Sequence, residues 1–185
     1  MSASEVLRKI TTLLDDAGIA YMLTGSFASA HYGAPRSTLD IDIVIAANPE
    51  QLQKFVHSLP NHEYYADLET ALEALHRQSM FNVIDSVQGW KIDLIIRKTR
   101  AFSQEEFERR KVVNVQELPL FVASPEDVVI SKLEWSKLSK SKRQIEDVAL
   151  ILRARRESLD EIYLKKWIRE LGLEKEWTEA QAAAI

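Results

Sequence analysis

The sequence contains no cysteine, and this absence excludes several classes of functional site. Without thiols the chain forms no disulfide, has no thiolate nucleophile and holds no Cys-based zinc site. Any metal ion must therefore be bound by oxygen ligands or by imidazole.

Long apolar runs are also missing from the 185 residues. No stretch approaches the roughly 20 uninterrupted apolar residues that a membrane-spanning helix requires. The first ten residues, MSASEVLRKI, lack the apolar core of a signal peptide. We therefore expect a soluble, cytoplasmic protein with no membrane partner.

The sequence has no overall excess of basic residues, since 24 Lys and Arg face 28 Asp and Glu, for a net charge of -4. This balance argues against a protein that coats nucleic acid by bulk electrostatics. Residues 137–156 differ, because they contain seven basic residues and only two acidic ones. This segment is either a solvated helix surface or a local basic face.

Apolar spacing and turn signals divide the chain into helices and strands, with no internal repeat. Serine with Glu three residues later predicts capped helices after Ser2 and after Ser103, and Asn48-Pro49 and Ser124-Pro125 predict two further helix starts. Strands are expected at 19–23, 39–46, 80–85, 90–96, 111–115 and 120–123, and further helices at 25–32, 49–59, 67–76, 145–152 and 159–171. The strands at 80–85 and 90–96 are expected to be antiparallel neighbours.

The pattern changes near Ser124, after which only helices are expected. We therefore predict an α+β fold with a small mixed β-sheet, flanking helices and a C-terminal helical part. The expected domains are a core of residues 1–123 and a helical region of residues 124–185.

Two carboxylates stand out on the strand at 39–46. Asp40 and Asp42 are two residues apart and so point to the same face, while Leu39, Ile41 and Ile43 point to the other. Like charges at this range repel each other unless a cation lies between them. The alternative is that both acids simply lie on the solvent-exposed face of an edge strand.

Asp93 repeats this pattern within the strand at 90–96, between large apolar residues. If that strand lies beside the strand at 39–46, Asp93 completes a group of three carboxylates. Hard oxygen ligands favour Mg²⁺ or Mn²⁺ over zinc. Two such ions activate an attacking oxygen and stabilise a leaving pyrophosphate.

Gly25-Ser26 lies where a strand is expected to turn into a helix, ahead of the acidic strand. Such a turn offers backbone N–H groups, a positive helix end and a hydroxyl to a phosphate group. A Gly-Ser pair in isolation is more often only a turn.

Taken together, Gly25-Ser26, Asp40-Ile41-Asp42 and Asp93 resemble the motifs of the polymerase-β-type nucleotidyltransferase superfamily. The string GSFASAHYGAPRSTLDIDIVI is similar to abortive-infection-type nucleotidyltransferase toxins and their uncharacterised relatives, and more loosely to lincosamide and aminoglycoside nucleotidyltransferases. The resemblance implies the nucleotidyltransferase fold. It also implies that Asp40, Asp42 and Asp93 are catalytic and hold Mg²⁺ or Mn²⁺.

The resemblance extends to the segments SPEDVVISKLEW and RQIEDVALIL. It implies that Lys132 contacts the triphosphate of the nucleotide and that Asp147 supports the site. Arg36 matches the family string and would meet a phosphate, although a structural salt bridge explains it equally well. The alternative for Lys132 is an exposed helix lysine with no role in the site. The implied nucleotide-binding residues are Gly25, Ser26, Arg36, Lys132 and Asp147.

The function expected from this resemblance is the metal-dependent transfer of NMP from an NTP, such as ATP, to an acceptor. The acceptor is a tRNA or other RNA, a protein or a small molecule, and the basic segment 137–156 makes RNA conceivable. A second hypothesis is an inactive binding module of the same fold, for instance a toxin-antitoxin component with an antitoxin partner. A metal-dependent phosphohydrolase is a third, since two-metal chemistry also serves hydrolysis.

Overall fold

The computed structural model describes residues 2–185, except for the side chain of Arg156. The described chain forms two compact units. One contains residues 2–24 and 37–122, and the other contains residues 25–36 and 123–185. The second unit is therefore discontinuous in sequence. The domain boundary predicted after residue 123 stays a prediction.

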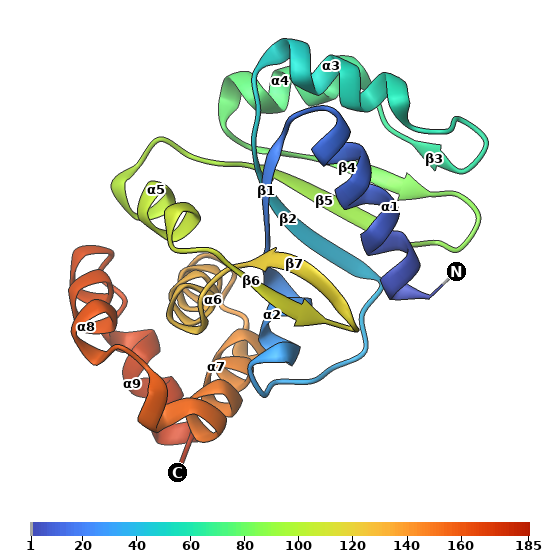
Figure 1. The fold of residues 1–185 in the computed structure, drawn as a ribbon. Coiled ribbons are helices and arrows are strands. Elements are labelled where there is room, and N and C mark those ends of the chain that lie inside the picture. The colour runs from blue at the N-terminus through green and yellow to red at the C-terminus, as the bar shows by residue number, and fades with distance from the viewer. Residues whose placement is uncertain (1) are drawn as a thin grey trace. The chain divides into compact units, whose positions relative to one another are not determined.

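A mixed β-sheet forms the centre of the first unit (Figure 1). Within the described residues its seven strands follow the order β3-β4-β5-β2-β1-β7-β6. Their bounds are β1 Ala20–Leu23, β2 Asp40–Ala46, β3 Tyr64–Tyr65, β4 Met80–Asp85, β5 Lys91–Ile96, β6 Lys111–Val115 and β7 Leu118–Val122. β2 runs parallel to β5 and β1 parallel to β7, whereas the other neighbouring pairs are antiparallel. β2 is thus an interior strand, and the alternative of an edge strand is excluded.

The helices of the first unit are α1 Ala3–Asp16, α3 Pro49–Ser58, α4 Leu68–Arg77 and α5 Ala101–Glu108. α1 packs on β1, α4 packs on β4, and α3 contacts both helices. On β2 the side chains of Ile41, Ile43 and Ile45 are fully buried. Each such burial contributes about 2 kcal/mol of hydrophobic stabilisation. This face anchors β2 and leaves the opposite face to Asp40 and Asp42.

Capping side chains fix several helix starts where the sequence predicts them. Ser2 and Asn48 each form a capping box, with Glu5 and Gln51 as the reciprocal partners. The carboxylate of Asp67 accepts a hydrogen bond from the third residue of α4. Each cap satisfies backbone N–H groups that have no partner within the helix.

The prediction that Ser103 caps a helix is wrong. α5 begins at Ala101, so Ser103 lies inside the helix, where it is buried and its hydroxyl accepts a hydrogen bond of 3.0 Å from Nε of Arg100. The short strand β3 was not predicted. β7 begins earlier than expected, because Gln116 and Glu117 both adopt positive φ and form a tight turn between β6 and β7.

The second unit is helical, as predicted for the C-terminal part. It comprises α2 Gly25–His31, α6 Pro125–Ser139, α7 Lys142–Arg155, the 3₁₀ turn η1 Arg156–Ser158, α8 Glu161–Glu170 and α9 Glu174–Ala183. α6 packs against α2 and α7, and α7 packs against α9. The α+β class with a mixed sheet and a helical C-terminal part is confirmed. None of the helices among residues 2–185 is both long and apolar enough to cross a membrane.

Gly33 follows α2 at a point of close approach to α7. Its φ is +116°, and a Cβ added there would lie 2.4 Å from Cβ of Ala154. We expect Gly33→Ala to lower the free energy of unfolding by about 3 kcal/mol, because backbone strain adds to the steric overlap. Urea denaturation measures this loss.

Gly89→Ala is the matched control for that substitution. Gly89 also has positive φ, at +77°, but an added Cβ there meets nothing within 4 Å. Because only backbone strain acts at this position, we expect Gly89→Ala to lower the free energy of unfolding by about 1 kcal/mol. Equal losses in the two variants would contradict the assigned overlap at Gly33.

Candidate active site

Two adjacent strands of the first unit position the three acids. β2 pairs with β5 in parallel, in a register that places Asp42 opposite Asp93 and Asp40 opposite Lys91. Because alternate residues share a face, the side chains of all four project from the same side of the sheet. Asp93 is buried, Asp42 is half-buried and Asp40 is exposed. The structure therefore contains the pairing of β2 with β5 that the predicted group of three acids depends on.

Asp93 is held from two directions. Asn82, its register partner on β4, donates a hydrogen bond from its side-chain amide to Oδ1. Nζ of Lys91 lies 2.9 Å from both carboxylate oxygens. The carboxylate of Asp93 is thus fixed in orientation before any ligand arrives.

Lys91 carries the positive charge of this group. Its hydrogen bond to Asp93 raises the pKa of Lys91 above its ordinary value, and partial burial opposes this effect. The charges of Asp93, Asp40 and Asp42 raise the pKa further. The ammonium is therefore stabilised by three carboxylates at once.

The donor set fits Mg²⁺ or Mn²⁺ by its chemistry, because all three candidate ligands are hard carboxylate oxygens. In the part of the chain that the structure describes, however, no three His, Asp or Glu side chains lie close enough together to hold a metal ion. The ammonium of Lys91 lies against Asp93 in this arrangement. The ligand roles of the three acids thus stay predictions.

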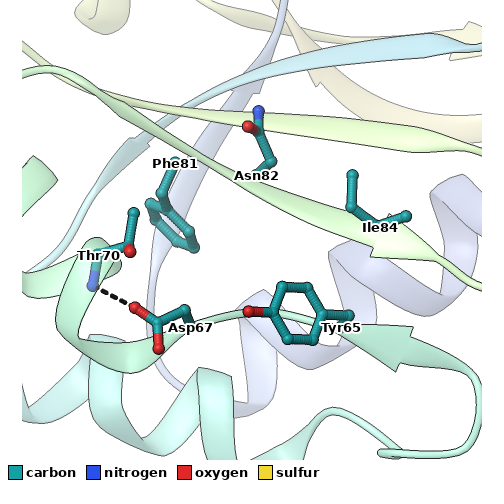
Figure 2. Close-up of a pocket in the computed structure, with 6 residues that line it drawn as sticks. All are labelled: Tyr65, Asp67, Thr70, Phe81, Asn82 and Ile84. Atoms are coloured by element: carbon teal, nitrogen blue, oxygen red, sulfur yellow. Dashed lines mark hydrogen bonds between the residues drawn. The ribbon is translucent and has the colours of Figure 1, made fainter.

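A small pocket adjoins this group at β4 (Figure 2). Its volume is about 200 Å³, and its lining residues are Tyr65, Asp67, Thr70, Phe81, Asn82 and Ile84. Asn82 belongs to both the pocket and the hydrogen bond to Asp93. Asp67 is already engaged, since it accepts a hydrogen bond of 2.7 Å from the backbone of Thr70. The volume falls below the roughly 300 to 1,000 Å³ typical of small-molecule sites, so this pocket is too small for a whole nucleotide.

The predicted nucleotide-binding residues lie in the second unit. Gly25 has positive φ and begins α2, and the next residue, Ser26, is buried. The guanidinium of Arg36 donates a hydrogen bond to the hydroxyl of Ser26. Nε of Arg36 also lies 3.7 Å from Oδ2 of Asp147. Arg36 thus makes the structural salt bridge that the sequence left open.

Lys132 and Asp147 form the buried centre of this second group. Nζ of Lys132 lies 2.6 Å from Oδ2 of Asp147, and their side chains are only 5% and 7% exposed. The same ammonium donates a 3.1 Å hydrogen bond to Oε1 of Gln144. The interpretation of Lys132 as an exposed helix lysine is therefore wrong. With two cations and one carboxylate, the group of Arg36, Lys132 and Asp147 carries one net positive charge.

Sequence reasoning missed three residues of these groups. Lys91 had a local signal, because it lies two residues before Asp93 on the same strand and so shares its face. Asn82 had none, since its role depends on the register between β4 and β5. Gln144 likewise depends on how α7 packs against α6.

Comparison with known proteins supports one assignment. A family model described as nucleotidyltransferase of unknown function (DUF6036) matches residues 3–183, nearly the whole chain. No curated protein sequence matches significantly.

Solved structures share the fold at low sequence identity. A nucleotidyltransferase-like antigenic protein from Paracoccidioides brasiliensis aligns with a TM-score of 0.54 at 16% identity, covering 100% of this chain and 95% of that one. A protein from H. pylori, solved as a candidate nucleotidyltransferase, aligns with a TM-score of 0.51 at 16% sequence identity. The alignment covers 99% of this chain and 84% of that one. ANT(2″)-Ia in complex with adenylyl-2″-tobramycin aligns with a TM-score of 0.50 at 12% sequence identity. The alignment covers 97% of this chain and 95% of that one. The family model confirms the expected resemblance to nucleotidyltransferases, and the chain belongs to the DUF6036 family of nucleotidyltransferases of unknown function.

Proposed function

We propose that the protein transfers NMP from an NTP to an acceptor in a reaction that depends on Mg²⁺ or Mn²⁺. The observation that carries this proposal is the parallel register of β2 and β5, which sets Asp42 opposite Asp93 and two residues after Asp40. These three carboxylates would hold the metal. A bound divalent ion supplies charge neutralisation at the phosphates and lowers the pKa of an attacking hydroxyl.

The side chains around the acids have distinct roles in this proposal. Asn82 holds Oδ1 of Asp93, so that the carboxylate keeps one orientation while its other oxygen interacts with a cation. Such orientation by a surrounding hydrogen bond strengthens metal binding. The buried isoleucines on the opposite face of β2 keep the strand itself in place.

The positive group of the second unit supports binding of the triphosphate. Arg36 is its most accessible cation, with a side chain that is 22% exposed, and we assign it to a phosphate oxygen. Asp147 lies 3.7 Å from Nε of Arg36 and is itself held by Lys132, so in this proposal Lys132 is a positioning residue that acts through Asp147. Gly25 and Ser26 contribute the backbone N–H groups of the first turn of α2.

The acceptor is proposed by class. The structure of ANT(2″)-Ia contains an adenylylated aminoglycoside, which favours a small hydroxyl-bearing acceptor as one class. The excess of basic residues in segment 137–156 favours RNA, including tRNA, as another. A protein acceptor and an antitoxin partner follow only from the resemblance to toxins.

A second candidate function is an inactive binding module of the same fold. The ion pair between Lys91 and Asp93 favours it, because in the described residues the acids do not gather as a metal site. A module of this kind would bind a nucleotide or a partner without transferring a group.

Transfer of radiolabel separates these two functions. The protein is incubated with each α-labelled NTP, with Mg²⁺ or Mn²⁺, and separately with cellular RNA, protein extract and small-molecule extract. We expect label in one acceptor fraction with the wild type and none with Asp40→Ala/Asp42→Ala. If no NTP donates label although one stabilises the fold against heat, the protein is a binding module.

A further inference from the structure

Lys91 lies among the acids of the first unit. It is the first residue of β5, it is the register partner of Asp40, and it shares a face with Asp93. Its side chain is 43% exposed, so the flexible four-carbon stem has room to move the ammonium into solvent.

Both oxygens of Asp93 are already engaged. Oδ1 accepts the amide of Asn82, and Oδ2 accepts Nζ of Lys91 at 2.9 Å. The amide is neutral, so it does not repel a cation that approaches Asp93. The ammonium is different, because it is a full positive charge at the place where a divalent ion would approach Asp93.

We propose that Lys91 is an internal counter-ion of Asp40, Asp42 and Asp93 that competes with the divalent metal, so that free metal binds weakly and loads together with the nucleotide. This inference rests on the proposed function. A bare divalent ion is repelled by the ammonium over a few ångströms. A metal-triphosphate is net negative, so the displaced ammonium attracts it instead.

The position also explains how the three acids coexist without metal. Three like charges on one face of a sheet destabilise a fold unless a cation offsets them. Lys91 offsets them within the chain. It thereby lowers the repulsion among the three carboxylates in the nucleotide-free protein.

Binding of Mn²⁺ to the nucleotide-free protein, measured by electron paramagnetic resonance, tests the competition. We expect Lys91→Met to bind Mn²⁺ about tenfold more tightly than the wild type, since a charge within a few ångströms changes a binding equilibrium of this kind by about tenfold or more. Lys91→Arg keeps the charge and is expected to bind as weakly as the wild type. Lys91→Met/Asp42→Asn is expected to lose the gain, which assigns the bound ion to these acids.

A second measurement uses the unaltered chain. Addition of a non-hydrolysable NTP analogue is expected to strengthen Mn²⁺ binding more in the wild type than in Lys91→Met, or in Lys91→Gln if the Met variant does not fold. Equal Mn²⁺ affinity in wild type and Lys91→Met overturns the role of Lys91 but leaves the acids as a metal site. Absence of Mn²⁺ binding in both proteins, with and without the analogue, overturns this inference and the proposed metal dependence together.

Discussion

Changing Asp42 to Asn is expected to lower the rate of nucleotidyl transfer about 1,000-fold while leaving the protein folded. Asp42 lies between the other two acids, opposite Asp93 on β5 and two residues after Asp40 on β2. Loss of its charge removes stabilisation of the transition state worth about 4 kcal/mol at 1.4 kcal/mol per tenfold. The fold is retained, because Asn has the same shape and fewer like charges remain on that face.

Initial rates with the NTP and acceptor identified by label transfer measure this effect. Glu50→Gln is a suitable control, since it removes one carboxylate from the exposed start of α3. That control should keep nearly the full rate. Transfer by Asp42→Asn within tenfold of the wild type would remove Asp42 from the catalytic group.

Lys132→Met is expected to destabilise the protein by about 3 kcal/mol. The substitution leaves the carboxylate of Asp147 buried without its 2.6 Å partner, and breaking one side of a buried ion pair is costly. Arg36 lies 3.7 Å away and offsets only part of the loss. Urea denaturation, with the wild type and variant fitted to the same slope, gives the difference.

Lys132→Met/Asp147→Asn is the informative companion variant. It removes both charges, so no buried carboxylate is left unpaired, and at least half of the lost stability should return. If the single and double variants lose the same free energy of unfolding, the stability comes from packing of the long lysine side chain and not from the charge pair.

The sequence predicts the elements of this fold well where the signal is local. Caps at Ser2 and Asn48 fix their helices, because a hydroxyl or amide three residues from a free N–H needs no distant partner. Ser103 has the same local signal but caps no helix, because α5 already begins at Ala101. β3 is only two residues long and exists through its pairing with β4, so no periodicity reveals it.

In the candidate site too, features with a local sequence signal could be predicted, whereas features that depend on distant contacts could not. Alternation along a strand places Asp40 beside Asp42, and the structure supplies the neighbouring strand that brings Asp93 opposite. Burial of Lys132 could not be predicted, because it depends on Asp147 and Gln144 of another helix. A lysine at a helical position has the same sequence signal whether it faces water or a buried carboxylate.

The discontinuity of the second unit limits how the protein can be cut and recombined. A fragment that starts at residue 123 or 124 contains Lys132 and Asp147 but omits segment 25–36, which supplies Ser26 and Arg36. It also omits Tyr32, whose hydroxyl donates a 2.8 Å hydrogen bond to the carbonyl of Ala123. If C-terminal segments were exchanged between family members, Arg36 would come from one protein, and Lys132 and Asp147 would be replaced by residues of the other. Chimaeras should carry segment 25–36 together with the C-terminal helices.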